Sequence, residues 1–243
     1  MEALGDRPLS GIITNAGLTT DGDVRSKDSY ELTFAVNVLA HQLLLVSLMD
    51  QVVEGGRVVV LSSGTHDPEK NALAKRFGIP KPRWVGTRNL ALPDEAPEDA
   101  RVEAGPLRYT TSKLGNVVQA RGMQRALHGQ GRDVDVFAVD PGLMVDTNLM
   151  RGRPWILRAV LRVVGSVLTL FVPNMRRSTT TAEYLTAMIA EEKWHGKGFQ
   201  YFDGIEPVEP STDGMRDVLM EEFWQGSGEL LGLRVPESVQ RVS

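Results

Sequence analysis

The chain has 243 residues, of which 42% are hydrophobic and 24% are charged, and these are ordinary values for a globular protein. Its formal net charge of −4 argues against a nucleic-acid partner, because such a partner normally requires a basic surface. The absence of cysteine excludes disulfides, thiolate nucleophiles and cysteine-ligated zinc, and it agrees with the cytoplasmic location that we expect. The four histidines are not spaced like metal ligands, so we predict no metal site.

Three short apolar runs predict buried strands, at residues 9–14, 58–61 and 134–139. Apolar residues at helical spacing predict helices over 30–53 and 107–127, which lie between these strands in the chain. Buried strands that alternate with helices are typical of a parallel α/β sheet, which binds its ligands at the carboxyl ends of the strands. Polar or turn residues follow all three runs, so we expect the site there.

Residues 65–106 differ from the rest of the chain, with six prolines among many charges and little periodicity. We interpret this stretch as a surface insertion, either a plain loop or a lid, with one short helix near 71–77. Beyond the third strand, we predict a helical region over 148–235 that covers the substrate. Its helices are expected at 154–172, 177–192 and 213–225, and one short strand is expected at 199–201.

The predicted helix 154–172 is very apolar, and four arginines flank or interrupt it: Arg151, Arg153, Arg158 and Arg162. The arginines break the stretch before it reaches the length of a clean membrane span. A helix that covers the substrate and has a solvated basic edge accounts for this composition. The alternative is weak contact with a membrane surface, since a basic edge beside apolar residues suits an interfacial helix.

Tyr109 and Lys113 are four residues apart at the start of a predicted helix, so both side chains lie on one helix face. A phenol with a pKa near ~10 needs a shift of roughly three units, about 4 kcal/mol, to act as a base near neutral pH. One cation at ~4 Å, in a medium of effective dielectric constant ~20, supplies about that much. The pair is therefore sufficient for proton transfer, although a solvated helix face gives the same spacing.

Five short pieces of sequence occur in a fixed order along the chain. Three of them end the predicted strands, namely Asn15-Ala16-Gly17, Ser62-Ser63 and Pro141-Gly142, whereas Asn37 lies within the first predicted helix and Tyr109 with Lys113 opens the second. This ordered set closely resembles the short-chain dehydrogenase/reductase family, from the family's fourth strand to its C-terminus. The resemblance implies a Rossmann-like, doubly wound parallel sheet, with residues 1–243 forming one partial domain. Two C-terminal stretches, Gly198–Phe202 and Phe223–Leu233, resemble the retinol dehydrogenase and protochlorophyllide reductase branch.

The resemblance also implies a role for each site residue. Tyr109 would exchange a proton with the substrate oxygen, while Lys113 would lower the pKa of that tyrosine and hold the nicotinamide ribose. Ser63 would donate a hydrogen bond to the carbonyl oxygen, and Asn37 would anchor a water in the proton relay. The alternatives are a turn-forming serine and an asparagine that is merely a satisfied core amide. His66 is interpreted as a loop residue.

The remaining implied contacts are with the cofactor, which the resemblance gives as NAD or NADP, with NADP favoured. Its adenosine side would be lined by Asn15, Ala16 and Gly17. Its nicotinamide would be faced by Pro141, Gly142, Met144 and Thr147. The implied reaction interconverts a carbonyl and an alcohol, or reduces a related double bond, on a small lipophilic substrate. Self-association of the chain into a homo-oligomer is an expectation left open.

The sequence contains no TGxxxGxG turn, the glycine loop that binds the cofactor pyrophosphate in this family. We therefore expect an N-terminally truncated fold that starts near the family's fourth strand, so that residues 9–14 would form an exposed apolar edge. A fragment or a misplaced start is the favoured explanation. The alternative function is a non-catalytic binding module or an inactive fragment derived from the family.

Overall fold

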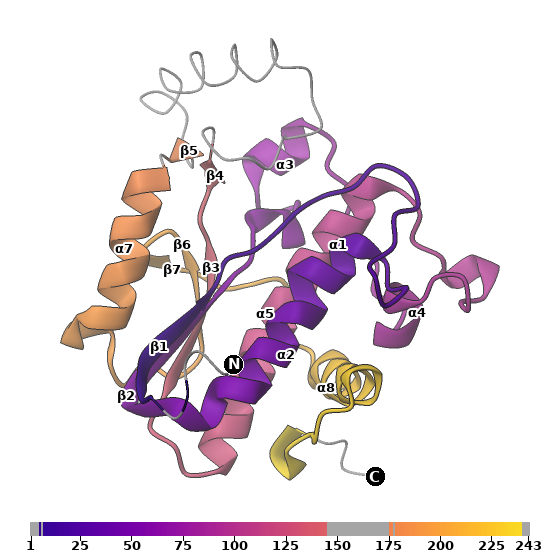
Figure 1. Ribbon diagram of the computed structural model, residues 1–243. Helices are drawn as coiled ribbons and strands as arrows, with labels where there is room; N and C mark the ends of the chain where they lie inside the picture. The colour runs from indigo at the N-terminus through magenta and orange to yellow at the C-terminus, as the bar shows by residue number, and fades with distance from the viewer. Residues whose placement is uncertain (1–4, 6, 145–174, 177, 240–243) are drawn as a thin grey trace.

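The computed structural model describes residues 5, 7–144, 175–176 and 178–239, and its centre is a five-stranded sheet in the order β1-β2-β3-β6-β7 (Figure 1). Four strands run parallel and a short fifth returns antiparallel: β1 (Leu9–Thr14), β2 (Val52–Leu61), β3 (Asp135–Asp140), β6 (Gln200–Asp203) and β7 (Glu206–Pro207). The predicted parallel α/β sheet is confirmed, with the three predicted strands as its neighbouring members.

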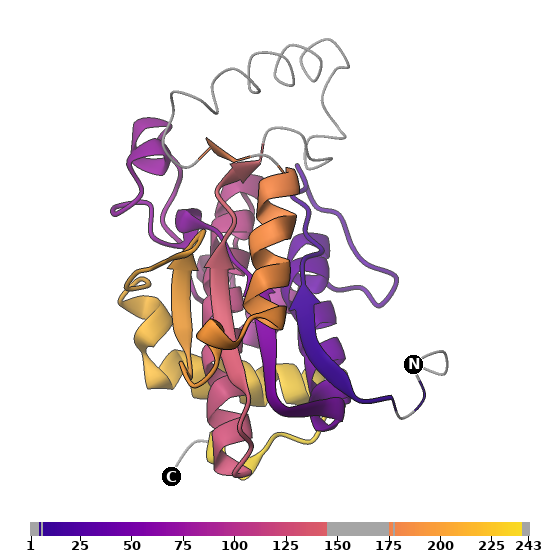
Figure 2. The ribbon, with the colours of Figure 1, turned by 90° about the vertical axis from the view of Figure 1, so that its left-hand side faces the viewer.

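Helices cover both faces of the sheet (Figure 2): α2 (Ala40–Leu48) and α5 (Gly105–Gly129) on one face, with α8 (Asp217–Leu231) against α5, and α7 (Ser178–Ala190) on the other. Alternate residues of β2 serve the two faces, because successive strand side chains point in opposite directions. Val58 and Val60 join the core under α5, whereas Val59 and Leu61 pack with Leu185 of α7. The doubly wound arrangement is therefore confirmed.

The helix predicted over 30–53 consists of consecutive pieces: α1 (Leu32–Phe34), η1 (Ala35–Leu39), α2 and η2 (Met49–Gln51), of which η1 is π-helical. The Glu31 carboxylate caps the first turn by accepting hydrogen bonds from the backbone N–H groups of Thr33 and Phe34, at 3.0 and 2.7 Å. In the part of the chain that the structure describes, only Leu32–Gln51 is apolar and long enough to cross a membrane. Since 56% of its most apolar window is buried inside the fold, it packs here as a core helix.

β2 begins at Val52, earlier than the strand predicted at 58–61, and it contains Gly55 and Gly56. The register of β1 against β2 shifts in this segment, which marks a bulge. Gly55 has φ +74°, and a Cβ on Gly56 would lie 2.6 Å from Cγ1 of Val52. The strand therefore requires glycine in this segment.

The proline-rich stretch contains the predicted short helix, α3 (Ala72–Arg76), and a second one, α4 (Thr87–Ala91), that was not predicted. It is more than a surface insertion, because Leu90 and Val102 are buried in the main core. The Glu222 carboxylate of α8 accepts a hydrogen bond from the first backbone N–H of α4 at 2.7 Å. Scattered apolar residues without periodicity hid this packing from the sequence analysis.

The predictions at 177–192, 199–201 and 213–225 correspond to α7, β6 and the start of α8. The predicted helix 154–172 lies outside the described residues. β1 is the outer strand of the described sheet, and Ile13 on it is 39% exposed. Short elements complete the described chain: η3 (Gly64–His66), η4 (Glu98–Ala100), β4 (Leu143–Met144), β5 (Met175–Arg176), η6 (Glu192–Trp194), η7 (Asp213–Met215) and η8 (Glu237–Val239).

Candidate active site

Four chain segments that are far apart in the sequence converge where β1 and β2 end and α5 begins. The position of a Cβ on Gly17 would lie 3.6 Å from Oδ1 of Asn37 and 3.8 Å from Nζ of Lys113. The same Nζ atom lies 5.7 Å from the centre of the Tyr109 ring and donates a hydrogen bond to the carbonyl oxygen of Leu61 at 3.2 Å. The structure therefore brings these predicted site residues together at the carboxyl edge of the sheet, as parallel α/β topology requires.

Ser63 follows β2 directly and is partly exposed. Its hydroxyl accepts a hydrogen bond from the backbone N–H of Thr65 at 3.3 Å and also makes a hydrogen bond with the side chain of Tyr109. Neighbouring Ser62 has a different role, because its buried hydroxyl donates to the backbone carbonyl of Lys113 at 2.8 Å. The second serine of the pair therefore faces the tyrosine, and the first fastens β2 to α5.

The pKa of Tyr109 is raised to about 12, mainly because many protein atoms surround its partly exposed side chain. The negative charge of Asp140 raises this pKa further, whereas the hydrogen bond with Ser63 lowers it. The net effect of its surroundings therefore raises the pKa of this phenol, and the lowering that we expected from the ammonium of Lys113 stays a prediction.

Lys113 is only 5% exposed, and burial lowers its pKa to about 8, while the charge of Asp140 raises it. The amine is therefore mainly charged at neutral pH although it lies in the protein interior. A buried ammonium needs acceptors for its hydrogens. It donates to Leu61 as stated above and makes a longer contact of 3.4 Å with Oδ1 of Asn116.

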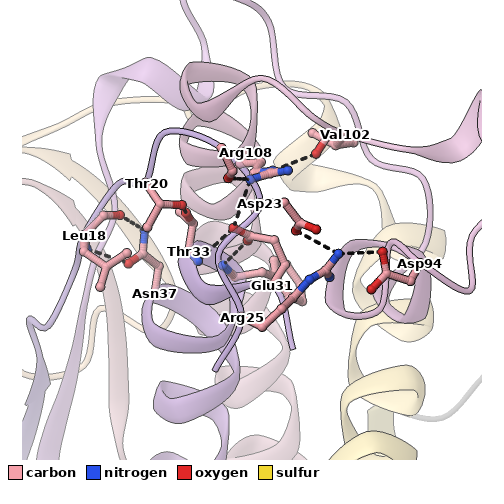
Figure 3. Close-up of polar contacts among 12 residues, drawn as sticks. Leu18, Thr20, Asp23, Arg25, Glu31, Thr33, Asn37, Asp94, Val102 and Arg108 are labelled. Carbon is pink, nitrogen blue, oxygen red and sulfur yellow. Dashed lines mark hydrogen bonds and ion pairs between the residues drawn. The ribbon is translucent and has the colours of Figure 1, made fainter. Parts of the chain in front are cut away.

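Asn37 is completely buried in the π-helix η1, and its side-chain amide is occupied (Figure 3). Oδ1 accepts from the backbone N–H of Leu18 at 2.8 Å, while Nδ2 donates to the carbonyl of Leu18 at 2.9 Å and to Oγ of Ser112 at 3.0 Å. Both amide hydrogens are used. The side chain thus behaves as the satisfied core amide of our alternative interpretation, and it ties the loop after β1 to α5.

Arg108, next to Tyr109, fastens the start of α5 to the loops around it (Figure 3). It is 7% exposed and donates to the carbonyl oxygens of Val102, at 2.8 Å, and of Gly22. Its guanidinium also lies 3.8 Å from the Glu31 carboxylate, which caps α1. This cluster fixes α5 relative to the helix that carries Asn37. It was not predicted from the sequence.

The remaining predicted cofactor contacts follow β1 and β3 in the chain. Asn15, Ala16 and Gly17 form an exposed loop after β1. Pro141 is buried, and Gly142, with φ +77°, donates its backbone N–H to the Asp140 carboxylate at 2.9 Å. Met144 belongs to β4, where only its backbone pairing with Arg176 is described, and Thr147 lies outside the described residues.

His41 supports a ligand beside Gly17. It is only 4% exposed, on α2, and neither ring nitrogen makes a well-formed hydrogen bond to the residues that the structure describes. Burial and the charge of Lys113 lower its pKa to about 4, and the nearby Ala16 backbone raises it slightly. A buried imidazole without a well-formed hydrogen bond to the described residues, a glycine without a side chain and a buried ammonium fit a ligand rich in hydroxyl oxygens, such as the ribose part of a nicotinamide cofactor.

His66 was interpreted as a loop residue, but it is 3% exposed and well bonded. Its Nδ1 lies 2.7 Å from the carbonyl oxygen of Ser63, and its Nε2 accepts from the backbone N–H of Ser211 at 3.0 Å. Its pKa is lowered by burial, so the neutral form with the proton on Nδ1 satisfies both bonds. Its place three residues after Ser63 was the only signal in the sequence.

No family model matches the chain, but individual proteins do. Mouse polyprenol dehydrogenase is 28% identical over 238 residues, which are 95% of this chain and 62% of the mouse protein. Human retinol dehydrogenase 13 is 26% identical over 230 residues, covering 93% of this chain and 61% of its own length. The chain therefore spans just over three fifths of these relatives.

Solved structures share the fold. An uncharacterised protein from Mycobacterium paratuberculosis superposes with a TM-score of 0.63 at 22% identity, covering 97% of this chain and 71% of its own. The angucycline C-6 ketoreductase LanV, solved with bound NADP, gives a TM-score of 0.51 at 18% identity and covers 84% of this chain and 66% of its own. In sequence and in fold, the resemblance of this chain to the short-chain dehydrogenases and reductases is confirmed.

Proposed function

We propose that this protein is an NAD(P)-dependent oxidoreductase that interconverts a carbonyl and an alcohol, with Tyr109 as its acid and base. The observation that carries the proposal is the hydrogen bond between the hydroxyls of Tyr109 and Ser63, with the buried ammonium of Lys113 beside the same ring. Two hydroxyl donors that meet at one point can both reach the oxygen of a carbonyl substrate.

A bound nicotinamide supplies the hydride for reduction and accepts it for oxidation. In reduction, the carbonyl carbon receives the hydride and the carbonyl oxygen receives the proton of Tyr109, which gives the alcohol. Ser63 donates a hydrogen bond to the same oxygen as negative charge develops on it. Because the pKa of Tyr109 is about 12, the phenol carries its proton at neutral pH, which is the form that reduction requires.

Lys113, Gly17 and His41 are the residues that would hold the ribose part of the cofactor, because they combine a cation, an open backbone and a buried imidazole. NADP is the favoured form, and the NADP bound in the ketoreductase LanV supports that choice. A lipophilic substrate is supported by the names of two relatives, which act on polyprenol and retinol. We keep membrane-surface contact and self-association as expectations.

The test is Tyr109→Phe, with Tyr30→Phe as the matched control. Tyr30 also uses its hydroxyl, donating to the carbonyl of Leu230 at 2.8 Å, but it lies outside the site. With NADPH and a panel of retinoid, steroid and long-chain carbonyl compounds, Tyr109→Phe should lower kcat by about 10² or more. It should bind cofactor as before. Turnover that survives in Tyr109→Phe refutes the assigned role.

The second candidate function is a non-catalytic binding module. It predicts a folded chain that turns over none of the carbonyl compounds with either cofactor. The wild-type protein in the same assay separates the two candidates, and a cooperative unfolding transition shows that the tested sample is folded.

A further inference from the structure

The π-helix η1 receives side-chain hydrogen bonds from α5. Nδ2 of Asn116 donates to the carbonyl oxygen of Asn37 at 2.7 Å, and Nε2 of Gln119 donates to that of Val38 at 3.2 Å. Asn116, Gln119 and both acceptor residues are completely buried. π-helical turns inside helices occur frequently at functional sites. This turn is therefore supported by specific side chains, one of which lies three residues after Lys113.

Asn116 also contacts the candidate site with the other end of its amide. Its Oδ1 lies 3.4 Å from Nζ of Lys113, so one side chain spans the ammonium and the carbonyl of Asn37. An ammonium only donates hydrogen bonds and a backbone carbonyl only accepts them, so these partners fix which end of the amide faces which. A reversed amide would place two donors against each other.

We propose that Asn116 is a positioning residue that holds the Lys113 ammonium in place against the π-helical turn. The proposal rests on the proposed function, because it assigns the Lys113 amine a fixed position beside the proton donor. It also bears on the expectation that Asn37 anchors a water in the proton relay. The place between Lys113 and the Asn37 carbonyl, where a relay water could bridge the two, is filled by an amide that contacts both groups and does not titrate.

The charged and titratable groups around Lys113 come from three elements. Asp140 at the end of β3 is the acid whose charge acts on it, Tyr109 lies on its own helix, and His41 on α2 is itself affected by the Lys113 charge. Asn116 adds a neutral acceptor to this set, at a distance too long for a strong effect on the pKa. A negative charge at position 116 would therefore act on the amine from a new direction.

The experiment compares Asn116→Asp, Asn116→Leu and Gln119→Leu with the wild type. The control Gln119→Leu removes a buried amide of the same network one turn further on, which donates to Val38 and Gln42 and accepts from Nδ2 of Asn116 at 3.5 Å but has no hydrogen bond with Lys113. The first readout is the pKa of Lys113, from the 13Cε shift of labelled lysine, with the signal assigned by its loss in Lys113→Met. This readout does not depend on turnover.

In Asn116→Asp the pKa of Lys113 should rise by about one unit or more, as expected for a new carboxylate within hydrogen-bonding distance. Gln119→Leu should leave that pKa unchanged. In turnover, Asn116→Leu should lower kcat by about tenfold through misplacement of the amine, whereas Gln119→Leu should retain the kcat of the folded wild type.

The two proposals can fail separately. If Asn116→Asp leaves the pKa of Lys113 at the wild-type value, Asn116 does not hold the amine, whatever the protein turns over. If the kcat of Asn116→Leu equals that of Gln119→Leu, the positioning role is overturned. If the wild type shows no turnover but the pKa responds as expected, the proposed function fails and the contact stands.

Discussion

Replacing Lys113 with Met should make the protein more stable and inactive. Methionine follows the unbranched stem of lysine closely but carries no charge. The pKa of Lys113 falls from 10.5 to about 8 on folding, because the charged amine is taken out of water. The folded protein therefore keeps an ammonium that its surroundings penalise.

The size of the penalty follows from the pKa shift. At about 1.4 kcal/mol for each pKa unit, a shift from 10.5 to about 8 corresponds to roughly 3 kcal/mol at neutral pH. Loss of the bonds to Leu61 and Asn116 offsets about 1 kcal/mol of this amount. The net gain is about 2 kcal/mol in the free energy of unfolding, or roughly 4–8 °C in Tm for a domain of this size.

The pH dependence has a definite sign. A pKa that is lower in the folded state gives stability that is present above pH 10.5 and lost as the pH falls through about 8. Lys113→Met should therefore be more stable than the wild type at pH 7, and this advantage should shrink and then reverse as the pH rises from about 8 to 10.5, because only the loss of about 1 kcal/mol from the missing bonds then remains. Urea unfolding at a series of pH values measures this. A variant that is less stable than the wild type at pH 7, by an amount that does not change with pH, would refute the reasoning.

Three further substitutions test other contacts. Asp140→Asn should lower the pKa of Tyr109 from about 12, because the Asp140 charge raises it, and ultraviolet phenolate titration against Tyr109→Phe should show the shift. His66→Ala should lower the free energy of unfolding by about 1–3 kcal/mol through loss of its bond to Ser63, and His66→Gln should restore part of this; equal stability of the two variants would contradict the contact. Gly122→Ala should lower the free energy of unfolding by about 1–3 kcal/mol, because the new Cβ would overlap the indole of Trp224, which packs on α5. An unchanged Tm would contradict that packing.

The sequence alone determined the architecture and the location of the site. The apolar run 58–61 predicted a buried strand, and the helices between the predicted strands favoured a parallel sheet that is covered on both faces. Since parallel topology brings all carboxyl ends to one edge, Ser63 and the pair Tyr109 and Lys113 were expected to meet. Local periodicity and chain order carry that information, so it could be read without coordinates.

Only the tertiary structure decided how the site is charged and held. Whether the pKa of Tyr109 rises or falls depends on its burial and on Asp140, which lies 31 residues further along the chain. The bonds that Asn116 makes to Lys113 and to the π-helical turn depend on the packing of two helices and leave no periodic trace in the sequence. Periodicity reports which side of an element is buried; distances between side chains from different elements, which set pKa values and hydrogen bonds, arise only when those elements pack.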